Sequence, residues 1–213
     1  YQAYNMAKKR VDEILENNNP SDLSIIMDLD ETVLDNSPYN GYLIKNGKDY
    51  DFESWTRWVR LAKAELVPGA LDFINYAEGQ GFTIYYLSNR RIENAEFTIK
   101  NLNAKGIDVS QERLLLQDGM TSKADRRKLV KSKSEPMLLI GDNLADFLGE
   151  YEQDLGIIDR KEITEKMQEF YGVHFILLPN PMYGAWEKAL KYNDPMIEED
   201  ENADKLKFLQ SFE

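Results

Sequence analysis

The sequence predicts an α/β fold with a doubly wound parallel sheet, in which helices cover both faces. Unbroken runs of apolar residues, such as Ile25 to Met27 ahead of Asp28, are typical of strands buried on both faces. These runs alternate with segments of helical periodicity, and parallel neighbours in a sheet need crossover connections of that kind. A length of 213 residues is enough for one such core with a small accessory region.

The elements can be assigned in chain order. Apolar residues at helical spacing predict a helix over 3–15, which the turn-rich stretch "ENNNPSD" ends. The stretch "LSIIMDLD" predicts the first strand at 23–30. The remaining expected elements are a helix at 68–81, a strand at 82–89, a helix at 91–106, a strand at 113–118, a helix at 122–133, a strand at 136–143, a helix at 163–172 and a strand at 173–180. We therefore place the α/β core at 21–180.

The segment 37–67 interrupts this alternation. It is rich in aromatic and turn residues and falls between the first strand and the helix expected after it. Ligands of open α/β sheets bind outside the carboxyl ends of the strands, so we expect this insertion to form a lid or wall over the site. Together with 1–20 and 181–213 it makes up the predicted accessory region, which is mainly helical.

Charge and composition narrow the partners. The chain has 26 basic and 38 acidic residues, and its formal net charge of −12 disfavours nucleic acids and anionic membrane surfaces as partners. The absence of cysteine excludes disulfides and zinc–thiolate sites. No apolar run approaches the roughly 18 residues that a membrane span requires. We therefore expect a small-molecule ligand.

Polar residues follow three of the predicted strands. "MDLDET" ends the first, "LSNR" the second and "GDNLADF" the fourth, and Lys123 opens a helix before the last of these. The carboxyl ends of parallel strands share one edge of the sheet, so these residues are expected to meet. Asp28 and Asp142 would repel each other there unless a cation lay between them. Oxygen ligands in an exposed cleft favour Mg²⁺.

These residues resemble, in the same order, the four motifs of haloacid dehalogenase-type phosphatases: "DLDET", Ser88, Lys123 and "GDNLADF". More narrowly, "DLDETVLDNSPYNGYL", "SWTRWV", "VPGALDF" and "LPNPMYGAWE" resemble the class C nonspecific acid phosphatases, bacterial enzymes of the lipoprotein e(P4) type. The resemblance implies a haloacid dehalogenase-like core and a phosphomonoesterase with bound Mg²⁺. It also implies 5′-nucleotides among the substrates, an acidic optimum, homodimers and an exported or lipid-anchored location. The chain departs from the family in having no lipid-acceptor cysteine.

Phosphoryl transfer needs an in-line nucleophile and a proton for the leaving group. We expect Asp28 to be the nucleophile and Asp30 the general acid and then base, with a pKa raised by the other carboxylates. Mg²⁺ would be held by Asp28, the backbone carbonyl of Asp30 and Asp142. Asp146 is expected to act behind the metal ligands, and Thr32 to orient Asp30.

The phosphoryl oxygens are expected to be held by Ser88, Asn89 and Lys123. Arg90 either organises the second motif or pairs with an acid. Of Arg126 and Arg127, one is expected to support Lys123 and the other to be plain surface.

Four other side chains are candidates for a role at the site or in the core. Trp55 and Tyr183 are expected to face each other across the entrance and to stack on an aromatic leaving group, and the resemblance points to the same pair. Trp58, one helical turn from Trp55, fits core packing better. His174, the only histidine, is interpreted as structural.

Two other functions compete with a phosphatase. A DxD motif also holds the metal of many glycosyltransferases, although no sugar-nucleotide domain is evident here. A noncatalytic protein could retain a pocket for phosphate or a nucleotide, but the intact pair of Asp28 and Asp30 argues against it. Release of inorganic phosphate separates a phosphatase from both alternatives.

Overall fold

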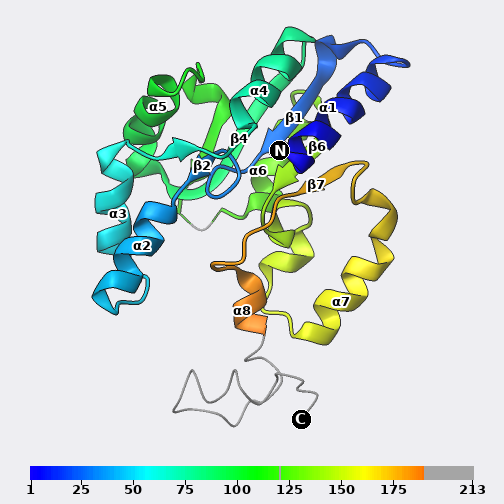
Figure 1. Cartoon of the computed structure of the whole chain (residues 1–213). Coiled ribbons are helices and arrows are strands. Elements are labelled where there is room, and N and C mark those ends of the chain that lie inside the picture. Colours follow the sequence, from blue (N-terminus) through cyan, green and yellow to red (C-terminus); the bar gives the residue numbers. More distant parts are fainter. Residues whose placement is uncertain (120, 190–213) are drawn as a thin grey trace.

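The computed structural model describes residues 1–119 and 121–189 and has a five-stranded parallel sheet at its centre (Figure 1). The strand order is β5-β4-β1-β6-β7. The strands are β1 (Leu23–Met27), β4 (Thr83–Arg91), β5 (Leu114–Gln117), β6 (Glu135–Gly141) and β7 (Phe175–Leu177). This architecture confirms the predicted doubly wound α/β fold. The chain changes direction across the sheet beside β1, where ligands of such folds bind.

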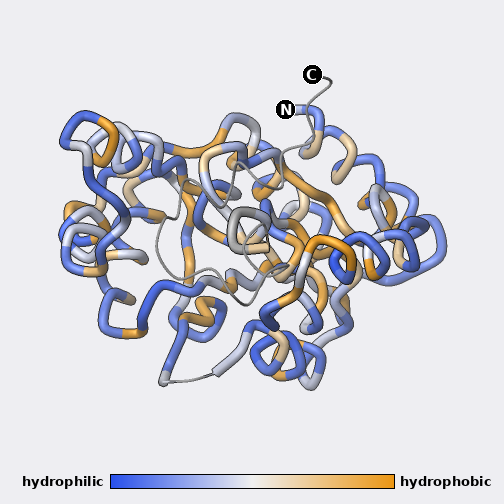
Figure 2. The backbone as a smooth tube through the Cα atoms, turned by 90° about the horizontal axis from the view of Figure 1, so that it is seen from below, coloured by the Kyte–Doolittle hydropathy of each residue, from blue (hydrophilic) through white to orange (hydrophobic). Residues whose placement is uncertain are grey.

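Helices cover both faces of the sheet. Ile25 and Met27 of β1 belong to the main hydrophobic cluster, which includes residues of α1 (Gln2–Leu15), α4 (Ala70–Gly79) and α5 (Ala95–Ala104). Ile26 points the other way, into a second cluster with Val130 of α6 (Lys123–Lys131). Every residue of β1 is therefore buried, which explains its unbroken apolar run. Figure 2 shows hydrophobic residues along the inner strands and hydrophilic ones around the rim.

Helix α1, which the sequence analysis assigns to the accessory region, is part of a layer of the core. Tyr4, Ala7, Val11 and Ile14 lie on one of its faces and are buried in the main cluster. Their spacing of three and four residues is that of a helical stripe. The helix packs against α4 and β7.

The insertion contains two helices, α2 (Ser37–Asn46) and α3 (Phe52–Leu61). Asp51 caps α3 by accepting a hydrogen bond of 2.8 Å from the Ser54 N–H. An antiparallel pair, β2 (Leu34–Asp35) and β3 (Glu65–Leu66), closes the base of the insertion. The sequence analysis did not predict this pair, because strands of two residues carry no periodicity.

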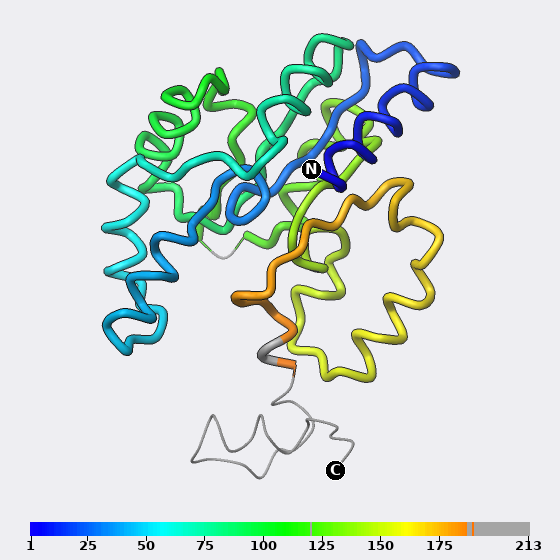
Figure 3. Tube along the Cα trace, viewed as in Figure 1, coloured from blue at the N-terminus to red at the C-terminus, as the bar shows by residue number. Residues whose placement is uncertain are grey.

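The chain after β6 is less regular than predicted. The helix expected at 163–172 is instead α7 (Ile157–Lys166), which a short 3₁₀ turn, η6 (Gln168–Phe170), follows. After β7 the chain passes the carboxyl ends of the strands and enters α8 (Ala185–Ala189), as Figure 3 shows. The other 3₁₀ turns are η1 (Pro20–Asp22), η2 (Ile92–Asn94), η3 (Gln111–Arg113), η4 (Leu144–Asp146) and η5 (Gly149–Glu152). Within the described residues, no helix has the length and apolar character needed to span a bilayer. Most of the predicted accessory segment 181–213 lies outside the described residues.

Candidate active site

Three carboxylates meet at the carboxyl ends of β1 and β6. Asp28 directly follows β1, and its N–H continues the sheet by donating to Ile140 O at 2.9 Å. Asp142 directly follows β6, and Asp146 lies in η4, four residues later. One carboxylate oxygen of each of the three aspartates lies within 4.8 Å of the other two. The sheet edge therefore brings together the residues that the strand ends predicted.

Lys123 reaches into this cluster from the first turn of α6. Its Nζ contacts Asp28 Oδ1 and lies 2.5 Å from Asp146 Oδ1. The start of α6 is held by Glu152, whose carboxylate accepts hydrogen bonds of 2.7 Å from the N–H groups of Lys123 and Ala124. A carboxylate at a helix N-terminus is favourable, and this one holds the backbone of the lysine in place.

The cluster carries an excess of negative charge. Burial raises the pKa of Asp28 well above its ordinary value; the Lys123 charge opposes the rise, and the Asp146 and Asp142 charges add to it. Burial and the Asp146 charge raise the pKa of Asp142 to about 6. Burial alone would lower the pKa of Lys123, but the charges and hydrogen bonds of Asp146 and Asp28 outweigh it and raise the pKa. One ammonium cannot balance three carboxylates, so a hard divalent cation with oxygen ligands fits this donor set.

Asp146 differs from the other two aspartates because protein donors already occupy both of its oxygens. Oδ1 accepts from Lys123, and Oδ2 accepts from the Asn143 N–H at 2.8 Å. Asn143 itself caps η4. A Cβ at Gly141 would lie 2.5 Å from the Asp146 Cβ, so only glycine leaves room for this side chain. These bonds leave Asp146 no unbonded oxygen for a metal ion, which agrees with a role behind the metal ligands; that role stays a prediction.

Asp142 is held by two residues from other parts of the chain. Asn180 Nδ2 donates to Asp142 Oδ2 at 2.8 Å, and Thr32 Oγ1 lies 3.5 Å from Asp142 Oδ1. The hydroxyl of Thr32 thus faces Asp142 rather than Asp30, and the role of Thr32 in orienting Asp30 stays a prediction. The sequence analysis also missed Asn180, although a polar residue after the last strand was a usable signal.

Asp30 has a different environment from Asp28. Arg90 donates to Asp30 Oδ1 through Nε at 3.0 Å and Nη2 at 2.7 Å, and Ser88 Oγ donates to Oδ2 at 3.1 Å. Burial raises the pKa of Asp30, but the charge and hydrogen bonds of Arg90 outweigh it and lower the pKa overall. The predicted rise of this pKa is wrong, since cationic and neutral donors surround the carboxylate. Of the two roles considered for Arg90, the structure has it paired with an acid.

The two arginines of α6 both serve the site. Arg126 donates to Ser88 O at 2.5 Å and to Asn89 Oδ1 at 2.7 Å, which ties the helix to the end of β4. Arg127 donates to the backbone carbonyls of Ala145 and Asp146 at 2.9 and 3.1 Å. The prediction that one of them is plain surface is wrong. The phosphate-binding roles of Ser88 and Asn89 stay predictions.

The aromatic side chains of the insertion form a cluster. The Trp55 ring lies 5.1 Å from that of Tyr39 and 6.3 Å from that of Tyr50, and the Arg90 guanidinium carbon lies 5.7 Å from the Trp55 ring. Trp55 is therefore a neighbour of the group that pairs with Asp30. The sequence analysis missed Tyr39 and Tyr50.

The remaining residues that the sequence singled out lie outside the carboxylate cluster. Trp58 packs on the core, as predicted, and its Nε1 also donates to Asn36 Oδ1 at 2.8 Å. His174 Nδ1 lies 3.1 Å from Met137 O at the sheet edge, which agrees with a structural role. The hydroxyl of Tyr183 donates to Glu31, and the position of Tyr183 opposite Trp55 across the entrance stays a prediction.

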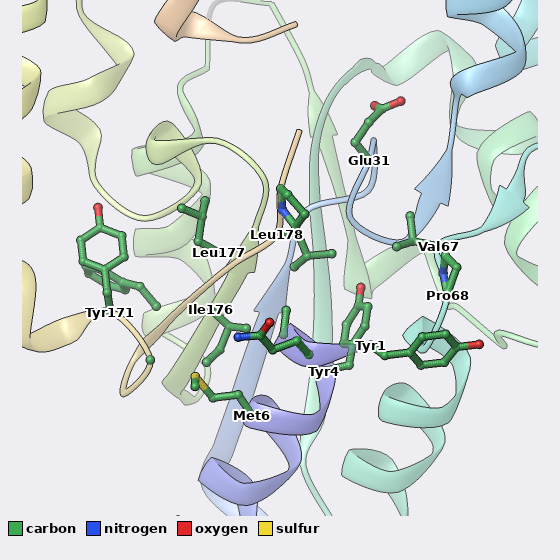
Figure 4. Close-up of a pocket in the computed structure, with 15 residues that line it drawn as sticks. Tyr1, Tyr4, Met6, Glu31, Val67, Pro68, Tyr171, Ile176, Leu177 and Leu178 are labelled. Carbon is green, nitrogen blue, oxygen red and sulfur yellow. The ribbon is translucent and has the colours of Figure 1, made fainter. Parts of the chain in front are cut away.

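Glu31 also lines a separate pocket of about 800 Å³ between α1, β7 and the loop after β3 (Figure 4). Tyr4, Val67 and Leu178 contribute to its mainly apolar wall, and Glu31 is the only charged residue of the lining. Asp28, Asp142 and Lys123 do not line it. The pocket is therefore distinct from the carboxylate cluster.

Comparison with known proteins agrees with this geometry. The family model described as "HAD superfamily, subfamily IIIB (Acid phosphatase)" matches residues 1–186. A solved class C acid phosphatase from Bacillus anthracis is 39% identical, with a TM-score of 0.91, and the match covers 100% of this chain and 90% of that one. The same enzyme with tungstate bound matches at 38% identity and a TM-score of 0.90, with the same coverage.

Plant proteins are more distant relatives. The stem 28 kDa glycoprotein of Glycine max is 29% identical over 138 residues, which are 59% of this chain and 53% of the relative. A stem 31 kDa glycoprotein of the same plant is 29% identical over 138 residues, 59% of this chain and 46% of the relative. The chain thus spans about half the length of the curated relatives it matches.

Proposed function

Because the chain belongs to subfamily IIIB of the HAD superfamily, the acid phosphatases, we propose that it is a Mg²⁺-dependent acid phosphatase that acts through an aspartyl-phosphate. Membership of this family confirms the resemblance that the four motifs indicate. The proposed substrates are phosphomonoesters, 5′-nucleotides among them. The observation that carries the proposal is the buried cluster of Asp28, Asp142, Asp146 and Lys123 at the carboxyl edge of the sheet.

Asp28, Asp142 and the backbone carbonyl of Asp30 would hold the Mg²⁺. When bound there, the ion would offset the repulsion between the carboxylate nucleophile and the phosphate dianion. Lys123 already contacts the nucleophile, so its ammonium is in place to neutralise a phosphoryl oxygen that approaches Asp28.

The reaction has two displacements at phosphorus. In the first, a carboxylate oxygen of Asp28 forms a bond to phosphorus while the bond to the leaving oxygen breaks, and Asp30 supplies the proton that the leaving alcohol takes up. In the second, Asp30 takes a proton from water, whose oxygen attacks phosphorus and releases inorganic phosphate and free Asp28. Asp30 thus returns to its starting protonation state, and the overall reaction consumes one water.

The entrance favours an aromatic leaving group. Trp55 lies beside Arg90, which pairs with Asp30. Tyr183 contacts Glu31, which follows Asp30 in the chain. A flat ring between two such side chains would be held by stacking, which does not distinguish one nucleobase from another. We therefore propose broad use of 5′-nucleotides. Export to the cell surface and a homodimer are further parts of the proposal, and they rest on the family alone.

A phosphate-release assay tests the proposed function. Purified protein is incubated with 5′-AMP, p-nitrophenyl phosphate and glycerol phosphate, with Mg²⁺ or with a chelator, and the covalent intermediate is sought by mass spectrometry after an acid quench. We expect release of phosphate only with Mg²⁺ and a phosphoryl adduct on Asp28. Binding without turnover would favour the noncatalytic alternative, and turnover of a sugar nucleotide without release of phosphate would favour a glycosyltransferase.

A further inference from the structure

Asn36, at the junction of β2 and α2, is fully buried and touches both acidic residues that follow Leu29. Its Nδ2 donates to Asp30 Oδ1 at 2.9 Å and to Glu31 Oε2 at 3.2 Å. Its Oδ1 accepts from Trp58 Nε1 at 2.8 Å and lies 3.5 Å from Arg90 Nη2. Its backbone N–H donates to Glu31 Oε1 at 3.2 Å. No catalytic motif of the sequence includes this residue.

The chemistry of its neighbours fixes which way the Asn36 amide points. Trp58 Nε1 and the Arg90 guanidinium can only donate, so they must face the amide oxygen. The carboxylate of Asp30, which Arg90 keeps ionised, can only accept, so it must face the amide nitrogen, and Glu31 Oε2 lies on the same side of the amide. The amide of asparagine offers a donor to one side and an acceptor to the other, as these neighbours require.

These contacts come from a different direction than the other contacts of Asp30. Ser88 and Arg90 both belong to β4, whereas Asn36 lies between β2 and α2, directly before the insertion. Asn36 Nδ2 thus adds a donor to Asp30 Oδ1 from outside β4, and this contact ties the orientation of the carboxylate to a second element. Trp58 then connects the orientation of Asn36 to helix α3, which also carries Trp55.

We propose that Asn36 is a positioning residue, which holds the carboxylate of Asp30 in the orientation that transfers a proton to the leaving group, and that Trp58 keeps the Asn36 amide in its working orientation. The inference rests on the proposed function, because it assumes that Asp30 is the general acid. It extends that function by making proton transfer depend on the packing of the insertion.

The test uses substrates that differ in their need for a proton. p-Nitrophenolate leaves without one, whereas the alkoxide of glycerol phosphate needs one. Comparing kcat/KM for the two substrates isolates the steps up to departure of the leaving group. We expect Asn36→Leu to lower kcat/KM about 100-fold for glycerol phosphate and less than about 5-fold for p-nitrophenyl phosphate, since general acid catalysis contributes roughly 10²–10⁴-fold.

Trp58→Phe is the second variant, because it removes only the N–H donor and keeps a ring in the core. We expect it to lower kcat/KM about 3- to 10-fold for glycerol phosphate alone, a fraction of the general acid effect. If Asn36→Leu fails to fold, Trp58→Phe decides the question. Equal losses on both substrates, or no loss on glycerol phosphate, would overturn the proposal.

Asn101 provides a matched control. It is also a buried asparagine that braces the insertion, since its Oδ1 accepts from the Ala64 N–H at 2.9 Å and its Nδ2 donates to Ala64 O at 2.8 Å. Asn101→Leu should lower the melting temperature without any preference between the two substrates. Asp30→Asn separates failure of the inference from failure of the proposed function. Like Asn36→Leu, it should lower kcat/KM more for glycerol phosphate than for p-nitrophenyl phosphate. If Asp30→Asn lowers both equally, Asp30 is not the general acid, and the inference fails with that role.

Discussion

The site has two sides: a Lys123 side with Asp28, Asp142 and Asp146, and an Arg90 side with Asp30. The two sides shift the pKa of the aspartates that follow β1 in opposite directions. Asp28 shares Lys123 with Asp146, and burial among carboxylates raises its pKa. Arg90 pairs with Asp30 and with no other carboxylate of the site, and Ser88 and Asn36 are further donors to Asp30. These interactions lower the pKa of Asp30 despite its burial. Only Leu29 separates these aspartates in the sequence, so their different roles come from the neighbours that folding brings to each.

The two sides of the site also suit different steps of the proposed reaction. The crowded side has surplus negative charge, as a cation site and a nucleophile require. The Arg90 side has donors that balance its one carboxylate, which orients the group and keeps it ionised while no substrate is bound. In the proposed cycle Asp30 must gain and lose a proton, so its ion pair with Arg90 has to loosen when a substrate binds. Four predictions test this division, in order of the expected effect.

The largest effects are expected from removing the two carboxylates themselves. Asp28→Asn should abolish the covalent intermediate and all measurable turnover, because no other group in the cluster replaces the nucleophile. Asp30→Asn should still bind substrate and Mg²⁺ but lose turnover by about 10²–10⁴-fold, the usual size of general acid–base catalysis. Steady-state kinetics and intermediate trapping measure both. Near-normal turnover in either variant would contradict the mechanism.

The next largest effects concern the cation site. Chelation should silence the enzyme reversibly. Asp142→Ala should weaken Mg²⁺ binding more than Asp146→Ala, for which we expect roughly the 10- to 100-fold loss of a group that supports a ligand. Isothermal titration of Mg²⁺ into each variant measures the affinities. Equal losses would mean that Asp146 is itself a ligand, as its position within 4.8 Å of the others allows.

A smaller effect is expected at the entrance. Stacking on a base is worth about 1–3 kcal/mol, so Trp55→Ala should lower kcat/KM for 5′-AMP by roughly 5- to 150-fold. Glycerol phosphate, which has no ring, should be almost unaffected. An unchanged melting temperature is the control for folding, because Trp55 also packs on Tyr39. Equal losses on both substrates would show that the tryptophan only supports the aromatic cluster.

The smallest effect is expected from Thr32, which the structure assigns to the Asp142 side. Thr32→Val keeps the shape of this buried side chain and removes a hydroxyl 3.5 Å from Asp142 Oδ1. A long hydrogen bond of this kind is worth at most about 1 kcal/mol, so Mg²⁺ affinity should fall by less than about 5-fold. kcat/KM should fall equally for aryl and alkyl phosphates. A loss of kcat/KM on alkyl phosphates alone would instead show that Thr32 acts on Asp30.

The sequence was sufficient to predict the sheet and the strand ends. Aliphatic runs and helical periodicity are local signals, and each of the five strands of the main sheet overlaps an expected one. Because parallel strands end at one edge, Asp28, Ser88 and Asp142 could be placed together before any contact was known. The two-residue strands β2 and β3 could not be predicted, since they exist only as a pair.

What the sequence by itself determined, then, is the fold class, the family motifs and the identity of the acidic residues, because each is written in a short stretch of chain. Only the tertiary structure decided which cation accompanies which carboxylate. Lys123 reaches Asp28 across 95 positions and Arg90 reaches Asp30 across 60, and no local pattern encodes either pairing. Since a pKa depends on burial and on charges within a few ångströms, the direction of each shift could not be known until the chain had been folded.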